Sequence, residues 1–303
     1  MTVSGLAAAV VVLGIAPLLP GIAVRTKSLL TGRHGAPVLQ LYYDLGKLLR
    51  KQPVYSATTT WIFRAGPLLV LAALLLAAFL IPLDGRAAPL RFAGDLVAFA
   101  GLLALGRFAL VLAGLDTGSS FEGMGASREV TVAAFAEPAL FLCFTGLVLA
   151  TGSVSLSGML GAPLGETWPR AAPSLTLVGI GLFVLLLAEN SRGPVDDPAT
   201  HLELTMIHEV TVLDHSGPDL AVILYGSALK LGLFGALVVC VFAPRAGLSA
   251  LAAIAILVAG LCIVAVAVGI VESVTARLRL VRVPQLLVGA GVFAAFGIIL
   301  LLA

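Results

Sequence analysis

Long stretches of hydrophobic residues, separated by short polar segments, recur along the whole chain. Windows of about twenty apolar residues are long enough to cross a bilayer as helices. Eight are present, near 2–24, 61–82, 93–115, 129–151, 172–190, 219–243, 247–271 and 284–303. In lipid, a segment of this kind pairs its backbone N–H and C=O groups by forming a helix. The pattern therefore predicts an all-α polytopic membrane protein, with residues 1–303 forming a single integral membrane domain.

The composition supports the same class of protein. The chain is 60% hydrophobic and 11% charged, with a mean hydropathy of +1.11, whereas soluble domains carry roughly 25% charged residues. The net charge of +2 is too small to indicate a nucleic-acid partner. The first apolar window lacks a basic leader and is too long for a signal-peptide core, so it is expected to remain as a helix.

Two further segments have the periodicity of amphipathic helices at the membrane surface. The segment 36–51 places leucines on one helical face and charged residues, including Asp44 and Lys47, on the other. The segment 199–213 repeats apolar residues at helical spacing after a proline. Each helix can act as structural bracing. Two of them on one side of the membrane would also form a platform for a soluble partner.

The basic residues between the windows predict the orientation. If alternate loops face opposite sides, one side holds Arg25, Lys27, Arg33, Lys47, Arg50, Lys51, Arg64, Arg128, Arg192, Arg277, Arg279 and Arg282. The other side holds only Arg86, Arg91, Arg170 and Arg245. Because cytoplasmic loops carry the excess of lysine and arginine, the first set is expected in the cytoplasm. Both termini are then predicted on the outer side of the cell inner (plasma) membrane.

Several ionisable residues lie within the windows or at their ends. A charge at membrane depth costs at least ~2.5 kcal/mol on insertion scales, so such residues are functional candidates. They are Arg107, Glu129, Glu137, Glu189, Lys230 and Glu272. Buried ion pairs that fix helix register are one explanation, with Arg107 and Glu137 on adjacent windows as the obvious pair. A water-bridged proton path is the other, because burial shifts acids and lysines toward neutrality.

The loop 189–218 carries an unusual density of titratable residues. Glu189, Glu203 and Glu209 are each possible partners for Lys230. His201, His208 and His215 recur every seven residues, so a continuous helix would carry all three on one face. That spacing rises about 10.5 Å, too far for a shared metal ion. A partner-facing or proton-exchanging histidine surface is the preferred interpretation.

Other chemistries find little support in the sequence. Cys143, Cys240 and Cys262 lie singly in apolar windows and form no ligand set for zinc or iron–sulfur clusters. No nucleotide-binding or serine-hydrolase motif is present. The glycine- and serine-rich segment 115–129 is predicted to be a flexible connection rather than a phosphate-binding loop.

Three motifs in order resemble one family. GRHGAPVLQLYYDLGKLLRKQ (32–52), GASREVTVAAFAEPALF (125–141) and ENSRGPVDDPATHLELTMIHEVTVLDHSGPDLA (189–221) are similar to the eight-helix membrane subunit shared by two complexes. These are respiratory complex I, in which it is subunit 1, and the membrane-bound nickel–iron hydrogenases, including the formate hydrogenlyase subunit 4 type. The resemblance covers nearly the whole chain.

The resemblance and the embedded charges together yield two sets of candidate residues, and no catalytic, metal or cofactor residue. The predicted ion pathway comprises Arg107, Glu129, Glu137, Glu189, Glu203, Glu209 and Lys230. The predicted docking set comprises Arg33, Asp44, Lys47, Arg192, Asp196, His201, His208, Arg277, Arg279 and Arg282.

Departures from the complex I pattern indicate the hydrogenase branch. The complex I loop resembles R-x-P-F-D-x-x-E-x-E-x-E, whereas here Val195 replaces the aromatic residue, and Ala199 and His201 stand at two glutamate positions. The family then implies hydrogenase large and small subunits, an iron–sulfur subunit and antiporter-like membrane subunits as partners. Iron–sulfur clusters and a nickel–iron site are expected on those partners and no cofactor in this chain. A quinone-reactive subunit of NADH-quinone oxidoreductase and a free-standing secondary cation transporter remain the alternatives.

Overall fold

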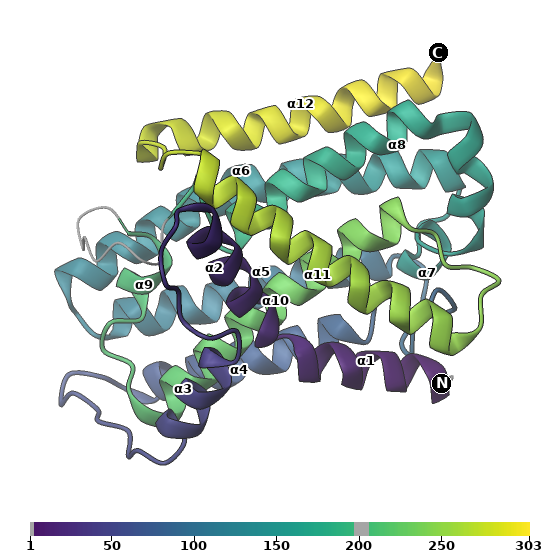
Figure 1. Cartoon of the computed structure of the whole chain (residues 1–303). Coiled ribbons are helices and arrows are strands. Elements are labelled where there is room, and N and C mark those ends of the chain that lie inside the picture. The colour runs from purple at the N-terminus through teal and green to yellow at the C-terminus, as the bar shows by residue number, and fades with distance from the viewer. Residues whose placement is uncertain (1–2, 197–205) are drawn as a thin grey trace.

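The computed structural model describes residues 3–196 and 206–303 as a bundle of long helices (Figure 1). No strand occurs among these residues, and the all-α prediction is confirmed. The helices are α1 (Val3–Ile15), α2 (Leu18–Leu30), α3 (Gln40–Leu48), α4 (Trp61–Ala78), α5 (Asp95–Asp116), α6 (Ser120–Thr151), α7 (Leu156–Met159), α8 (Ala162–Glu189), α9 (His208–Thr211), α10 (Gly217–Phe242), α11 (Ala250–Val274), the 3₁₀ helix η1 (Leu280–Arg282) and α12 (Val283–Leu302).

Seven helices within the described residues are long and apolar enough to cross a membrane, and the bent pair α1–α2 makes up to eight. The pair is bent by 46° at Ala16 and Pro17. Proline has no backbone N–H, so the break frees carbonyl groups. The hydroxyl of Tyr225 donates to Leu13 O at 2.9 Å, and that of Tyr42 donates to Gly14 O. Two other helices thereby satisfy the broken turn.

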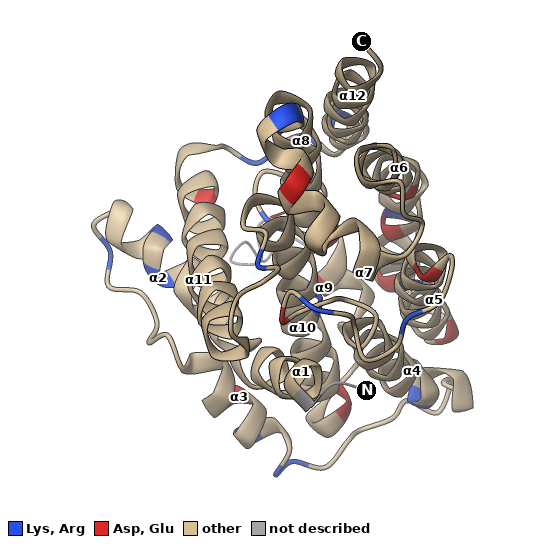
Figure 2. Cartoon of the chain, turned by 90° about the vertical axis from the view of Figure 1, so that its right-hand side faces the viewer, with Lys and Arg blue, Asp and Glu red and all other residues tan. Residues whose placement is uncertain are grey.

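The helix α10 lies at the centre of the bundle when it is viewed from the right-hand side of Figure 1 (Figure 2). In its most apolar stretch 72% of residues are buried, against 33% in α11 and 28% around α12. It packs against α4, α8 and α11. The outer helices therefore offer most of the surface that faces lipid.

The first correction concerns segment 115–129, predicted to be a flexible connection. The helix α6 begins at Ser120 and continues for 32 residues. Gly125 lies within this helix, and Thr211 packs directly against it. A Cβ at position 125 would meet Thr211 Oγ1 at 2.7 Å and Thr211 N at 2.8 Å. The glycine provides close packing rather than flexibility. The window near 172–190 is also longer than predicted, since α8 starts at Ala162 and passes a kink at Ala171.

The second correction concerns the amphipathic segments. The helix α3 is shorter than the predicted 36–51, since it spans Gln40–Leu48. Ala36 precedes Pro37 and therefore avoids helical geometry. The prediction for 199–213 lies partly outside the described residues. Within the described part the helix is limited to His208–Thr211. Asp196 accepts the N–H of Ile207 at 2.8 Å, which fixes the chain just before this single turn.

Candidate functional site

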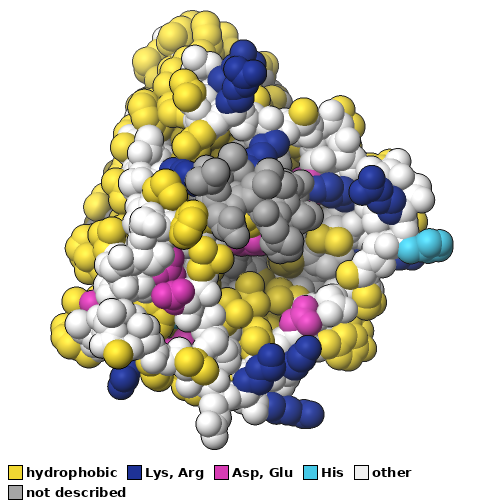
Figure 3. All heavy atoms as spheres, turned by 90° about the vertical axis from the view of Figure 1, so that its left-hand side faces the viewer, with side chains coloured by type: hydrophobic (Ala, Val, Ile, Leu, Met, Phe, Trp, Pro, Cys, Tyr) yellow, Lys and Arg dark blue, Asp and Glu magenta, His cyan; other side chains and the backbone are white. Residues whose placement is uncertain are grey.

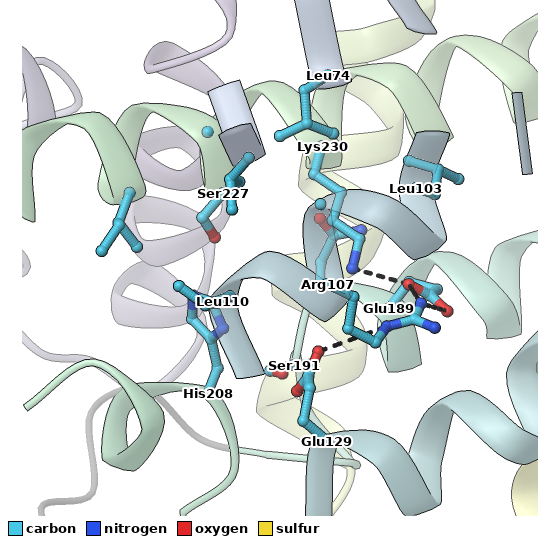
Figure 4. Close-up of a pocket in the computed structure, with 15 residues that line it drawn as sticks. Leu74, Leu103, Arg107, Leu110, Glu129, Glu189, Ser191, His208, Ser227 and Lys230 are labelled. Carbon is cyan, nitrogen blue, oxygen red and sulfur yellow. Dashed lines mark hydrogen bonds and ion pairs between the residues drawn. The ribbon is translucent and has the colours of Figure 1, made fainter. Parts of the chain in front are cut away.

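Five charged side chains from four helices meet within the bundle, and we name them the Arg107 cluster: Arg107, Glu129, Glu137, Glu189 and Lys230. The Arg107 guanidinium donates from Nη1 to Glu137 Oε1 at 2.7 Å and from Nη2 to the Glu189 carboxylate at 2.6 Å. Its Nε lies 3.8 Å from Glu129 Oε1. Lys230 Nζ lies 2.7 Å from Glu189 Oε2 (Figure 4). The expected Arg107–Glu137 pair is thus one contact within a larger network.

Burial makes the charge balance of this cluster important. The side chains of Arg107 and Glu189 are 7% and 6% exposed, while Glu137 is 44% exposed. Two cations face three carboxylates, so the cluster carries one net negative charge when all five groups are ionised. The four more deeply buried groups balance one another, and the excess negative charge belongs to the half-exposed Glu137. Addition of a single proton would balance the cluster.

Two cavities meet at the cluster. One of about 50 Å³ is lined by Arg107, Glu129, Glu189, His208 and Lys230, and also by Asn190, Ser191 and Ser227. The rest of its lining is apolar or glycine, and its volume and these polar side chains together suit a few bound water molecules. The other cavity, of about 150 Å³, lies between α5 and α6 and includes Glu137. Arg107 and Glu189 line both the cavity beside His208 and the cavity between α5 and α6.

The loop that follows Glu189 is attached to the connection between α11 and α12. Arg277 Nη2 lies 2.7 Å from Asp196 Oδ1. Arg192 pairs with Glu272 at 3.6 Å, and the N–H of Leu278 donates to Pro194 O at 2.9 Å. Arg192, Asp196 and Arg277, all predicted as docking residues, therefore hold the chain's own loop in place.

The condition for a shared histidine face, a continuous helix through these positions, is not met in the described residues. The helix α9 ends at Thr211, so His208 and His215 do not share a helical face. His208 lines the 50 Å³ cavity, and burial lowers its pKa. His215 stacks on Phe63 with ring centroids 3.9 Å apart, and burial lowers its pKa to about 4. Neither ring nitrogen of His215 has a hydrogen-bond partner among the described residues.

The remaining predicted residues do not form one cluster. His201 and Glu203 lie outside the described residues. Glu209 is half-buried in α9, next to His208. Asp44 in α3 accepts from Gln40 Nε2 at 2.9 Å. Arg33, Lys47, Arg279 and Arg282 are exposed, and basic side chains lie at several places on the face that Figure 3 shows.

Sequence reasoning missed three buried acids, Asp84, Asp95 and Glu122, of which Glu122 shares a helix with Glu129. Glu122 is fully buried, and its Oε1 accepts the N–H of Asp214 at 3.0 Å. It lies seven residues before Glu129, on the same face of α6, because seven residues make about two helical turns. That spacing was a usable signal. Treating 115–129 as a flexible connection obscured it.

The described residues offer no resident metal centre. No group of three histidine, cysteine, aspartate or glutamate side chains within residues 3–196 and 206–303 is placed to hold a metal ion. The cysteines Cys143, Cys240 and Cys262 lie in three different helices. Cys240 Sγ accepts from Arg245 Nη2 at 2.9 Å.

This helical bundle with a buried charge network is that of a family of respiratory membrane subunits. The sequence model of the NADH dehydrogenase family, the complex I subunit 1 family, matches residues 3–303, and the chain belongs to this family. It is 32% identical to formate hydrogenlyase subunit 4 of Escherichia coli K12 over 97% of each chain. It is 33% identical to hydrogenase-4 component C of the same organism, over 80% of this chain and 76% of that one.

Two further similarities extend the picture. The chain is 27% identical to a subunit of NADH-quinone oxidoreductase from Wolbachia pipientis wMel, over 69% of this chain and 66% of that one. Its fold matches a chain in the structure of the membrane-bound sulfane sulfur reductase, an archaeal respiratory membrane complex. The TM-score is 0.85 over 98% of each chain at 21% identity. The predicted family is thus confirmed, and the chain is a multi-pass membrane protein related to membrane subunits of hydrogenase-type and complex I-related complexes.

Proposed function

We propose that this chain is the membrane anchor and ion-coupling subunit of a hydrogenase-type, complex I-related redox complex. Hydrogenase-4 component C and formate hydrogenlyase subunit 4 are each more than 30% identical to this chain. The loop around Val195 also departs from the complex I pattern, and both points favour hydrogenase over quinone chemistry. A free-standing transporter is disfavoured, because the relatives belong to multisubunit complexes.

The Arg107 cluster carries the coupling part of the proposal. With all five groups ionised the cluster carries one net negative charge, contributed by the half-exposed Glu137, and uptake of one proton would neutralise it. A charge change in a module docked beneath the loop would alter the affinity for that proton, at about 1.4 kcal/mol per pKa unit. The cavity at His208 would admit water on the loop side. Glu137, half exposed between α5 and α6, would be the exit toward antiporter-like membrane subunits.

The anchoring part assigns the redox centres to partners. A large and a small hydrogenase subunit and an iron–sulfur subunit would dock on the side that carries α3 and α9, and would hold the iron–sulfur clusters and the nickel–iron site. Both termini lie at the opposite end of the bundle (Figure 1). Together with the excess of lysine and arginine in the loops on the α3 and α9 side, this arrangement supports a cytoplasmic docking face in the cell inner membrane.

A vesicle experiment tests the coupling. Glu137→Gln leaves the shape of the side chain and balances the cluster at zero net charge. We expect inverted vesicles that contain the whole complex to keep most of their redox activity but to lose most redox-driven acidification. Glu166→Gln is the matched control, because Glu166 is exposed at the far end of α8. If vesicles with Glu137→Gln acidify as fully as wild type, this residue is not part of the ion path.

Co-purification tests the anchor separately. A tagged wild-type chain should bring iron–sulfur and nickel-containing subunits with it after mild detergent extraction. A chain that purifies alone and still transports ions would contradict the anchoring role and favour a transporter. Both Glu137→Gln and Glu166→Gln should retain the partners, since neither residue lies on the docking side.

A further inference from the structure

The connection between α11 and α12 carries three arginines with different surroundings. Arg277 is bound to Asp196 at 2.7 Å. Arg279 and Arg282 are exposed and have no ion-pair partner among the described residues. Between and beside them, Leu280 is 40% and Val281 is 83% exposed. We name Val274, Arg279, Leu280, Val281 and Arg282 the 274–282 rim.

The rim continues an apolar stripe along α11. Ile263, Val266, Ile270 and Val274 are exposed by 68%, 37%, 44% and 78%. Their spacing of three, four and four residues places them on one face of the helix. Since α11 is apolar enough to span the bilayer and is mostly unburied within the chain, this face suits hydrocarbon tails.

The rim lies where such a stripe must meet lipid headgroups. Only eight residues separate the end of α11 at Val274 from the start of α12 at Val283. The connection therefore stays close to the membrane boundary. Exposed valine and leucine side chains suit the acyl region there, and arginine binds phosphate through parallel N–H donors. Basic residues at this depth are attracted to anionic lipid.

We propose that the 274–282 rim binds anionic phospholipid, with Arg279 and Arg282 on the phosphate and the apolar side chains against the tails. The site lies outside the Arg107 cluster, and it assigns lipid rather than a protein partner to Arg279 and Arg282, two members of the predicted docking set. A soluble protein partner is the less suitable occupant, because the rim's apolar residues are continuous with the lipid-facing stripe. The lipid would hold the α11–α12 connection, and through Arg277 and Asp196 the loop that follows Glu189.

A lipid titration of the purified complex tests the proposal. The thermal midpoint in detergent is measured against added dioleoyl phosphatidylglycerol, with dioleoyl phosphatidylcholine and inorganic phosphate in parallel. We expect only phosphatidylglycerol to raise the wild-type midpoint. Arg279→Gln/Arg282→Gln should need on the order of 10-fold more lipid, since each basic residue adds about one tenfold factor or less. Arg279→Lys/Arg282→Lys should keep most of the response.

The matched control is Arg50→Gln/Lys51→Gln, which removes two exposed charges from the end of α3 and should titrate like wild type. Equal half-saturation for Arg279→Gln/Arg282→Gln and wild type would overturn the proposal. An equal response to inorganic phosphate would overturn the lipid assignment. If the glutamine variant lost its iron–sulfur subunits with its lipid response unchanged, the rim would be a protein interface instead.

Discussion

Replacing Lys230 by methionine tests whether charge balance stabilises the Arg107 cluster. The change keeps the length of the side chain and removes the ammonium 2.7 Å from Glu189. The net charge of the cluster then falls from minus one to minus two. Breaking a buried pair costs about 3–5 kcal/mol. Because Arg107 still binds Glu189, we expect the lower end, about 3 kcal/mol. At ~2 °C per kcal/mol for a large chain, the thermal midpoint should fall by about 6 °C.

The assay is thermal unfolding of the purified complex in detergent, followed by intrinsic fluorescence. Lys51→Met, an exposed lysine outside the predicted docking set, is the control and should leave the midpoint within about 1 °C. The double variant Lys230→Met/Glu189→Gln restores a net charge of minus one and should recover part of the loss, since neighbouring groups couple by about 0.5–3 kcal/mol. A double variant less stable than Lys230→Met would refute the charge-balance argument.

Three further predictions concern the surroundings of the cluster. The free energy of unfolding should fall by about 2 kcal/mol from pH 7 to pH 5, because the buried ring of His215 has a pKa of about 4 in the folded state against an ordinary 6.5. His215→Phe should weaken this dependence of the thermal midpoint on pH. Gly125→Ala should destabilise by about 1–3 kcal/mol by contact with Thr211, whereas Gly123→Ala, with open space at Cβ, should not; limited proteolysis near Thr211 should separate them. Tyr225→Phe should cost about 1–3 kcal/mol by leaving Leu13 O unpaired, unlike Tyr43→Phe at an exposed site, and an unchanged midpoint would contradict this.

The number of spans and the membership of the cluster were largely predictable from the sequence. Hydropathy reports directly on burial in lipid, so each window became a helix or, at Pro17, a bent pair. The charges at membrane depth were conspicuous because lipid makes them expensive. Arg107 and Glu137 are 30 residues apart on consecutive helices, and their pairing followed from that adjacency.

The rest depended on contacts between distant parts of the chain. Arg107 and Glu189 are 82 residues apart, and no local pattern shows that α5 and α8 face each other. The glycines in 115–129 suggested a flexible connection, whereas Gly125 allows α6 to pack closely against Thr211. The seven-residue histidine repeat would share a face only on a continuous helix, whereas α9 spans His208–Thr211. Local periodicity could not reveal either tertiary constraint.

The length of α6 has an electrical consequence. Glu129 and Glu137 are eight residues apart on this helix, which corresponds to about 12 Å along its axis. That is roughly two-fifths of a hydrocarbon core of ~30 Å. A proton that moves between the two carboxylates would cross a similar share of the transmembrane voltage, or about 0.9 kcal/mol per 100 mV. An energised membrane would therefore bias which carboxylate is protonated, and the polarity of the cell would act on the cluster directly.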